Sequence, residues 1–375
     1  MIESIIFFFS GSGMVMLFIL FMRINVVGSK SKLVKHRSKE PGFVDLLIYA
    51  SVVDEGVIVG KDGSLMAAWA YQGVDSNSST EAERDQVSLQ INHALSRMGS
   101  GWMIHIDAVR KPAPGYSAKD DSHFPDPVSA AIDEERREFF ERVGTLYESN
   151  YVITATYLPP LLAQQKFVEL MFDDEGVPVD SKTRTIALLN HFKRECANIE
   201  SHLSSVFRMK RLKGKTITKE DNSSVNYDAF LRWIQFCISG LDHPVILPKN
   251  PIYLDALLSG QEFWGGVVPK IGQNFIQVVS IEGFPLASSP GLINSLADLP
   301  CLYRWSTRFI FMDTHEAVGH LEKFSKKWKQ KIRSFFDQVF NSHSSNVDQN
   351  AINMVSDAQA AIAETNSGEV AQGYY

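Results

Sequence analysis

The segment at residues 299–313 alternates strictly between two kinds of side chain, and this alternation constrains the fold more than any other feature of the chain. Successive side chains of a strand point to opposite faces of a sheet. One face would be largely aromatic and would carry Tyr303, Trp305, Thr307, Phe309 and Phe311. The other would carry Leu302, Arg304, Ser306, Arg308 and Ile310. The pattern predicts a sheet strand that follows Pro300.

Arg304 and Arg308 are the unusual members of this strand, because a guanidinium group is costly to bury without a partner. Two interpretations stay open. Either the arginines belong to an ordinary strand and reach solvent or pair locally, or they form a ligand site. We favour the first, because structural ion pairs are the commoner use of such residues. Both arginines are kept as candidate structural or interface residues.

The same strand resembles a signature of one protein family. Leu299-Pro300 followed by Tyr303-Arg304-Trp305-Ser306-Thr307-Arg308-Phe309 is similar to the pattern found in the CagE/TrbE/VirB family of conjugal transfer and type IV secretion ATPases. Further segments resemble the family in the same order and lie at residues 43–47, 57–64, 97–102, 124–127, 133–137, 253–258, 283–285 and 373–375. The resemblance covers about residues 43–375 of the chain.

The resemblance implies that the chain is the N-terminal assembly and membrane-association region of such an ATPase. The sequence holds neither a Walker A nor a Walker B motif, so we expect it to end before the P-loop motor domain of the family. ATP and Mg²⁺ are implied for the full-length protein, together with hexamers, export of substrate or DNA, and pilus biogenesis. The implied partners are type IV secretion channel and inner-membrane subunits. Within this chain we expect no catalytic residue, cofactor site, metal site or direct nucleic-acid site.

Two other functions stay open. The chain could be a stand-alone, non-catalytic membrane adaptor that binds secretion-channel subunits. It could also be an independent enzyme that uses His105 and Asp107, which share one face of an expected strand. Two such residues without a third are weak support for a metal or acid–base site, and a cross-strand polar pair explains them better.

Composition sets broad limits on the function. A formal net charge of −6 argues against a general nucleic-acid coat protein. The chain has three cysteines, Cys196, Cys237 and Cys301, without paired spacing. This sparse, odd number is typical of a reducing compartment and predicts neither disulfides nor a zinc site. Because each cysteine lies in an apolar pattern, we expect all three to be buried.

The N-terminus contains an uncharged apolar run from Ile5 to Met22, eighteen residues long. A helix of this length can just cross a bilayer core of roughly 30 Å. The basic residues lie after the run, which predicts that the bulk of the chain faces the cytoplasm. We therefore expect a transmembrane anchor at residues 1–23, a basic linker at 24–42 and location in the bacterial inner membrane.

The remaining patterns predict an α+β fold in which the N-terminal transmembrane helix is followed by mixed hairpin and helix domains. An N-terminal α+β domain is expected at residues 43–160. A helical middle section is expected at 161–243, because apolar residues recur every three or four positions there. A second α+β portion is expected at 244–375, leading toward an absent ATPase domain.

A charged helix is expected to begin at Asp126-Pro127, since Pro is favoured in the first helical turn. Its apolar stripe includes Ile132, Phe139, Val143 and Leu146. The acidic residues of its first turns complement the helix dipole. Arg136 and Arg137 are candidate structural or interface residues that could contact a neighbouring chain.

A second amphipathic helix is expected at residues 314–341. Its apolar stripe includes Phe324 and Trp328, and its opposite face carries Lys323, Lys326, Lys327, Lys329, Lys331 and Arg333. Such a basic face fits an anionic lipid surface or an acidic partner. The commoner interpretation is a solvated face of a helix that packs on the core.

Two segments superficially resemble a phosphate-binding loop. A P-loop needs Gly, four residues, then Gly-Lys-Ser/Thr. Only three residues separate Gly56 from Gly60, and Met209 occupies the first glycine position before Gly214-Lys215-Thr216. We therefore assign no nucleotide site to either segment.

Overall fold

The computed structural model describes residues 42–73, 78–159, 179–218, 224–248, 252–281, 291–332, 349–368 and 371–374. The chain divides into two compact units, Met1–Leu47 and Ile48–Tyr375. In the first unit the short helix α2 (Phe43–Leu46) is described, and Asp45 accepts a hydrogen bond from the Gly42 backbone N–H at 2.8 Å. The larger unit contains all the elements described below.

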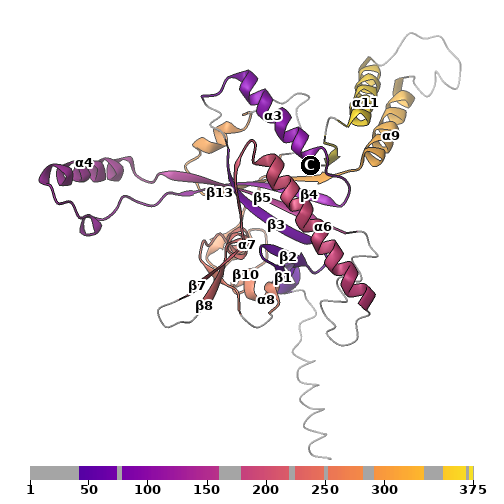
Figure 1. Cartoon of the computed structure of the whole chain (residues 1–375). Helices are drawn as coiled ribbons and strands as arrows, with labels where there is room; N and C mark the ends of the chain where they lie inside the picture. Colours follow the sequence, from indigo (N-terminus) through magenta and orange to yellow (C-terminus); the bar gives the residue numbers. More distant parts are fainter. Residues whose placement is uncertain are drawn as a thin grey trace, which may run out of the picture. The chain divides into compact units, whose positions relative to one another are not determined.

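An eight-stranded antiparallel sheet forms the centre of the larger unit (Figure 1). Seven of its strands lie in the order β1-β2-β3-β5-β4-β13-β14, and β6 also pairs with β3. The strands are β1 (Tyr49–Asp54), β2 (Val57–Gly60), β3 (Leu65–Gln72), β4 (Trp102–Pro112), β5 (Tyr147–Tyr157), β6 (Arg208–Arg211), β13 (Tyr303–Phe311) and β14 (Gly373–Tyr374).

The alternating segment that opened the sequence analysis forms β13, as predicted. It pairs with β4 from Tyr303 opposite Arg110 to Ile310 opposite Met103. Its aromatic side chains are partly covered, whereas Arg304, Ser306 and Arg308 are exposed. On the other edge of β13, β14 pairs with only Ile310 and Phe311. The sheet thus joins strands from both ends of the larger unit.

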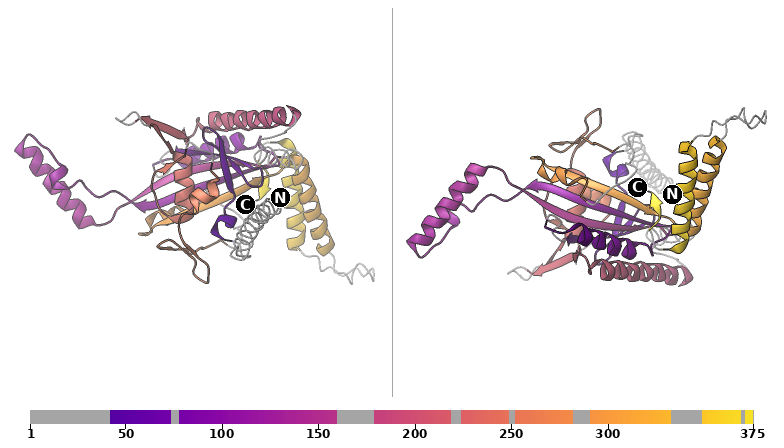
Figure 2. Two further views of the ribbon diagram at one scale, coloured as in Figure 1. Left: turned by 90° about the horizontal axis from the view of Figure 1, so that it is seen from below. Right: turned by 90° about the horizontal axis from the view of Figure 1, so that it is seen from above.

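The main hydrophobic core lies between one face of the sheet and two helices, α3 (Glu81–Leu95) and α6 (Val179–Leu203), which follow the same face (Figure 2). Phe192 of α6 is fully buried and stacks on Trp102 of β4, with ring centroids 5.6 Å apart. The buried Trp69 of β3 donates from Nε1 to Glu200 Oε2 of α6 at 2.9 Å. Helix α3 begins with a capping box, in which the Thr80 side chain accepts the Glu83 N–H and the Glu83 side chain accepts the Thr80 N–H.

The opposite face of the sheet is covered by α7 (Ala229–Ser239) and the short strands around it. Asp228 caps α7 by accepting the Leu231 N–H at 2.8 Å, and the helix ends at Gly240 with a positive φ of 74°. The neighbouring elements are β7 (Gly214–Thr218), β8 (Ser224–Asp228), β9 (Val245–Ile246), α8 (Leu254–Leu258), β10 (Phe263–Trp264), β11 (Lys270–Ile271) and β12 (Asn274–Phe275).

Two further helical elements lie at the two ends of β4. Helices α9 (Thr314–Ile332) and α11 (Gln349–Ser367) pack side by side (Figure 1). Helix α4 (Pro127–Val143) lies at the far end of the ribbon made by β4 and β5. A short 3-10 helix, Asn294–Asp298, precedes β13.

The structure confirms the mixed α+β class but corrects the rest of the predicted fold class. Among the described residues no helix is long and apolar enough to cross a membrane. This finding contradicts the N-terminal transmembrane helix of the predicted fold class. The segments predicted as anchor, residues 1–23, and as basic linker, with the exception of residue 42, lie outside the described residues.

The predicted helical middle section is also corrected, because β6, β7 and β8 lie within it. The helical periodicity ends near Phe207, and the next four residues pair through their backbone with β3. That pairing depends on a partner distant in sequence, which local periodicity does not reveal. The domain boundaries at residues 160 and 243 stay predictions.

The core geometry predicts a large effect of Phe192→Ala. This substitution removes a fully buried ring that stacks on Trp102 and leaves a cavity. We expect the free energy of unfolding to fall by about 3–5 kcal/mol, measured by urea denaturation followed by circular dichroism. Ile186→Ala in the same helix, where the side chain is 59% exposed, is the matched control and should change it by less than about 0.5 kcal/mol. Equal effects would contradict this packing.

Candidate interaction sites

Residues 113–146 form an arm at the end of the β4–β5 ribbon. The last strand pair before the arm is Pro112 with Tyr147, and the Ala113 N–H donates to the Leu146 carbonyl at 2.8 Å. The arm contains a loop with a 3-10 helix, Lys119–Asp121, followed by α4.

The sequence determines both ends of α4. Asp126 caps its N-terminus by accepting the Ser129 N–H at 2.9 Å, which lowers the pKa of the Asp126 carboxyl. Pro127 occupies the first turn, as predicted. Gly144 ends the helix with a φ of 81°, a conformation that other residues rarely adopt.

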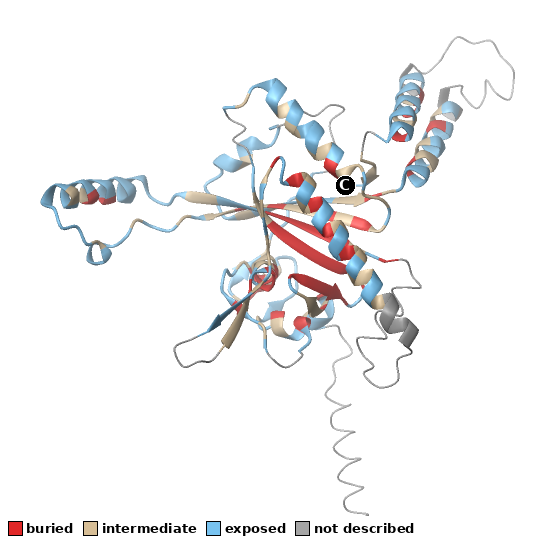
Figure 3. Ribbon diagram, viewed as in Figure 1, coloured by how far each residue is buried: buried red, intermediate tan, exposed pale blue. Residues whose placement is uncertain are grey.

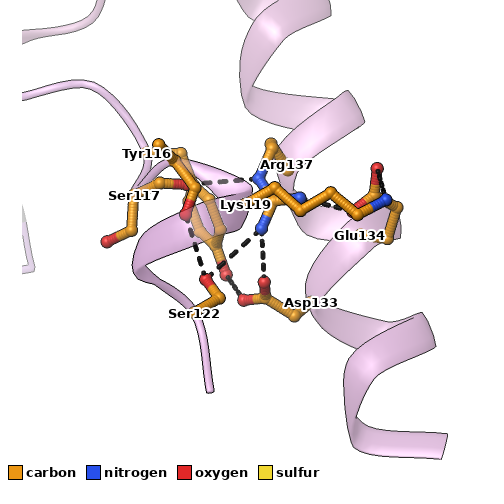
Figure 4. Close-up of polar contacts among 8 residues, drawn as sticks. Tyr116, Ser117, Lys119, Ser122, Asp133, Glu134 and Arg137 are labelled. Carbon is orange, nitrogen blue, oxygen red and sulfur yellow. Dashed lines mark hydrogen bonds and ion pairs between the residues drawn. The ribbon is translucent and has the colours of Figure 1, made fainter. Parts of the chain in front are cut away.

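Arg137 fixes α4 to the loop of the arm (Figure 4). Its guanidinium group donates to Asp133 Oδ2 at 2.7 Å and to the Ser117 carbonyl at 3.1 Å, and it also pairs with Glu134. The Tyr116 hydroxyl donates to Asp133 Oδ1 at 2.7 Å, which raises the pKa of Tyr116. The side chains of Arg137 and Asp133 are only 10% and 11% exposed. Arg137 therefore has a structural role within one copy.

Helix α4 consequently buries a charged pair and exposes its apolar side chains, which is the reverse of the usual orientation of an amphipathic helix. Val128, Ile132, Phe139 and Val143 are 66%, 51%, 55% and 48% exposed (Figure 3), and Leu146 beyond the helix is 42% exposed. The stripe does not pack on the main core because the β4–β5 ribbon holds α4 away from the sheet. The direction in which the stripe points thus depends on the tertiary placement of the arm.

Arg136 is exposed on α4, unlike its neighbour Arg137. An exposed guanidinium group is available to a carboxylate or a backbone carbonyl of another chain. Its role as a contact for a neighbouring chain stays a prediction.

Arg304 of β13 pairs locally, as its interpretation as a structural residue requires. Its Nε donates to Asp107 Oδ1 of β4 at 3.1 Å, and its Nη1 donates to the Cys237 carbonyl of α7 at 3.3 Å. The Asp107 side chain is 4% exposed and the Arg304 side chain 35%. Tyr49 lies in the same group, and burial raises its pKa to about 12. Arg304 thereby joins the sheet to α7.

Arg308 is exposed and lies opposite His105 in the pairing of β13 with β4. Burial lowers the pKa of His105, and the charges of Arg304 and Arg308 act in the same direction. The interpretation of His105 and Asp107 as a catalytic pair gains no third group here. Within the described ranges no set of three or more His, Cys, Asp or Glu side chains could hold a metal ion.

The basic face of α9 is partly described. Lys323, Lys326, Lys327 and Lys329 are exposed, and Lys326 pairs with Glu322 at 3.4 Å. Lys331 belongs to α9, although its side chain is not among those described, and Arg333 lies outside the described residues.

The apolar side of α9 packs on α11, but one ring remains accessible. Ala317 and Ser325 are buried, whereas Phe324 is 43% exposed next to Lys323 and one turn before Lys327. The basic face of α9 thus includes an aromatic ring.

A cavity of about 480 Å³ lies between the sheet and α7, and no sequence motif predicted it. Its lining includes Tyr71, Lys111, Tyr151, Arg232, Trp233 and Phe236. Arg232 and Lys111 both pair with Asp242. These contacts lower the pKa of the Asp242 carboxyl, and the hydrogen bond from Arg232 has the larger effect. The cavity is assembled from segments far apart in the sequence, so no local pattern marks it.

Neither P-loop-like segment forms a loop between a strand and a helix. Gly56 lies in the turn between β1 and β2, and Gly60 ends β2. Gly214, Lys215 and Thr216 lie inside β7, paired with β8. A strand backbone cannot wrap a phosphate as a P-loop does.

Two regions of the chain match known protein families. Residues 56–165 match "Type IV secretion system ATPase VirB4/TrbE, N-terminal domain". Residues 215–375 match "CagE, TrbE, VirB family, component of type IV transporter system".

Individual relatives agree with these matches. "Conjugal transfer protein TrbE" of Rhizobium radiobacter is 43% identical over 342 residues, which are 90% of this chain and 41% of that protein. In Sinorhizobium fredii, "Probable conjugal transfer protein TrbE" occurs as two separate polypeptides. The first is 49% identical over 125 residues, 33% of this chain and 84% of that polypeptide. The second is 42% identical over 185 residues, 49% of this chain and 28% of that polypeptide.

These similarities define a class of protein, the components of type IV secretion machinery. The chain belongs to the CagE/TrbE/VirB family, which confirms the resemblance found in its sequence. It spans less than half the length of the Rhizobium radiobacter relative.

The contacts of Arg137 predict that Arg137→Met loosens the arm. The substitution leaves the carboxylate of Asp133 buried without its cation, which costs about 3–5 kcal/mol. We expect faster amide hydrogen exchange in residues 127–143, with β3 and β5 unchanged, measured by mass spectrometry. Arg136→Met on the exposed side of the same helix is the control. Unchanged exchange in Arg137→Met would show that the pair does not hold the arm.

The expectation that all three cysteines are buried is wrong for Cys301, which is exposed, whereas Cys196 is buried and Cys237 is half-buried. Cys301 lies in the segment that leads into β13, before the strand pairing begins. Burial raises the pKa of Cys196 to about 11 and that of Cys237 to about 12.

These differences predict selective thiol chemistry. Only the thiolate reacts with an alkylating reagent, and about one thiol in a thousand is ionised at pH 8 when its pKa is about 11. In the folded protein at pH 8 we expect iodoacetamide to label Cys301 first, as measured by peptide mass spectrometry. All three cysteines should react after denaturation. Equal labelling in the native protein would contradict the burial of Cys196.

Proposed function

We propose that this chain is the N-terminal assembly region of a conjugative transfer (type IV secretion) ATPase. In this role it supports export of substrate or DNA and pilus biogenesis by binding secretion-channel and inner-membrane subunits and other copies of itself. It would act at the cytoplasmic face of the bacterial inner membrane. Membership of the family and similarity to conjugal transfer proteins support the proposal.

The exposed apolar face of the arm is the observation that carries this proposal. Four large apolar side chains lie on one face of α4, and each is about half exposed or more. Exposed apolar surface of this kind is a common mark of a protein interaction site. The hydrogen bonds of Arg137 fix the opposite side of α4 to the loop of the arm, so the apolar face stays exposed.

We assign no residue of this sequence to the ATP hydrolysis of full-length family members, or to the binding of the ATP and Mg²⁺ that the reaction needs. The two glycine-rich segments that come nearest to a P-loop lie in or beside paired strands. The contribution proposed for this chain is therefore binding and positioning of partners.

The proposal predicts that the double substitution Phe139→Ser and Val143→Ser reduces conjugation. Loss of central apolar contacts at an interface typically costs about 2 kcal/mol or more, so transfer should fall by at least about tenfold. The measurement is transfer frequency from a donor whose natural gene carries the substitutions, with protein abundance checked by immunoblot.

The matched control is Leu89→Ser on α3, which replaces another exposed apolar side chain, 68% exposed, outside the arm. Normal transfer by the arm variant at normal abundance would overturn the proposed function of the arm.

A further inference from the structure

The cavity between the sheet and α7 has a mainly apolar interior. Its floor includes Ala70 of β3, Val109 of β4 and Val152 of β5, and the two valines are buried. The wall that α7 provides includes Trp233 and Phe236, whose rings stack with centroids 5.9 Å apart. Pockets that hold ligands typically have such apolar walls and volumes of about 300–1,000 Å³. At about 480 Å³ this cavity has room for an aromatic side chain.

Two sets of polar contacts hold α7 over this floor. Near the C-terminus of the helix, Arg304 of β13 donates to the Cys237 carbonyl. Near its N-terminus, Arg232 pairs with Asp242, which also pairs with Lys111 of β4 at 3.1 Å. The fold itself therefore forms the cavity, and a ligand need not spend binding energy on opening it.

The charged side chains of the lining are partly exposed and already paired. Asp242 lies between Arg232 and Lys111, and Lys111 also pairs with Glu148 at 3.4 Å. Two carboxylates thus balance two cations in this group. Any net charge that a ligand meets must come from residues beside the cavity.

Strand β6 places two further cations beside the cavity. In the pairing of β6 with β3, Lys210 lies opposite Ala70 and Arg208 lies opposite Gln72. Ala70 and Gln72 both line the cavity. Side chains directly opposite each other share one face of a sheet, with Cβ atoms about 5 Å apart. Lys210 and Arg208 therefore stand next to the lining on the face that α7 covers.

These two cations form a positive surface of their own. Lys210 and Arg208 are exposed, and neither forms an ion pair with a residue that the structure describes. Arg211, between them and the rest of the basic run, points to the other face and lies 4.5 Å from the centre of the Trp69 ring. Because Lys210 and Arg208 are two residues apart on one strand, they lie roughly 6.5–7 Å apart.

We propose that this site binds an extended segment of a partner protein, with an aromatic side chain in the cavity and two carboxylates against Lys210 and Arg208. Alternate side chains of an extended peptide are also roughly 6.5–7 Å apart, which matches the spacing of the two cations. The exposed amides of Gln72 and Asn150 line the cavity and offer donors and acceptors to a peptide backbone. The inference goes beyond the proposed function, which rests on the arm.

A peptide fits this site better than a single strand of nucleic acid does. A nucleic acid carries a phosphate at every nucleotide, so a strand that followed the site would also bring phosphates near Asp242 and Glu148. Like charges at such short range repel. A peptide can carry its carboxylates opposite Lys210 and Arg208 alone and place neutral backbone elsewhere.

The test measures peptide binding to the purified full chain by isothermal titration calorimetry. The probe is an acetylated and amidated peptide of sequence GWGDGDG, which presents one ring and two carboxylates at alternate positions. We expect this peptide to bind. The peptides GAGDGDG, without the ring, and GWGNGNG, without the charges, should each bind at least about tenfold more weakly.

Two variants of the chain test the two parts of the site. Lys210→Glu combined with Arg208→Glu should weaken binding of GWGDGDG at least about tenfold and should favour GWGKGKG, because the charges are exchanged. Ala70→Leu fills part of the floor and should weaken GWGDGDG by a similar factor. The matched control, Lys323→Glu with Lys327→Glu on α9, changes the net charge equally and should bind as the unmodified chain does. Circular dichroism checks the fold of each variant.

Several results would overturn the inference. Absence of binding to GWGDGDG would exclude the site. Equal binding of GWGNGNG would show that the cations play no part, and normal binding by Ala70→Leu would show that the ring stays outside the cavity. If oligothymidylate of about eight nucleotides bound more tightly than the peptide, and lost binding in the Lys210→Glu, Arg208→Glu variant, the ligand would be nucleic acid.

These results are distinguishable from a failure of the proposed function. The variants leave the arm unchanged, and calorimetry does not depend on conjugation. A negative binding result would therefore refute this site alone. Normal transfer by the arm variant with Phe139→Ser and Val143→Ser would refute the function of the arm alone.

Discussion

The antiparallel pairing of β4 with β5 is the interaction on which the other features of the larger unit depend. The two strands pair along their whole length, from Trp102 opposite Tyr157 to Pro112 opposite Tyr147. At one end they form the floor of the hydrophobic core under α6, and at the other they carry the arm. β4 also provides the edge to which β13 binds. One strand pair therefore determines the positions of the core, the arm and the arginine strand.

Two ion pairs with a buried carboxylate illustrate how similar chemistry can serve different structural ends. Arg304 with Asp107 joins distant segments, since its hydrogen bonds link β13 to β4 and α7. Arg137 with Asp133 is local and joins one helix to the loop before it. Removing the arginine of such a pair leaves a buried charge, which is more destabilising than the pair is stabilising. The first pair should therefore affect the whole sheet and the second only the arm.

Much of the local structure follows from the sequence, and the errors have physical causes. The alternation of β13 and the Asp126-Pro127 start of α4 were both predicted, because each depends on neighbouring residues. The exposure of the α4 stripe and the strand β6 were not predicted, because both depend on contacts with distant segments. For the same reason Arg137 could be singled out as a candidate structural or interface residue, but its partners could not be predicted. The cavity beside α7 had no sequence signal at all.

The limited reach of β14 along β13 has a consequence for solubility. In the described part of the chain β14 pairs with just two residues of β13, so much of that strand presents an open backbone edge. Open edges invite non-native strands to add and begin aggregation. Arg308 is exposed on this strand, and an exposed charge on an edge strand opposes the addition of a second strand. Of the two arginines of this strand, Arg304 thus serves the contact with α7, and Arg308 lies where a charge disfavours edge-to-edge association.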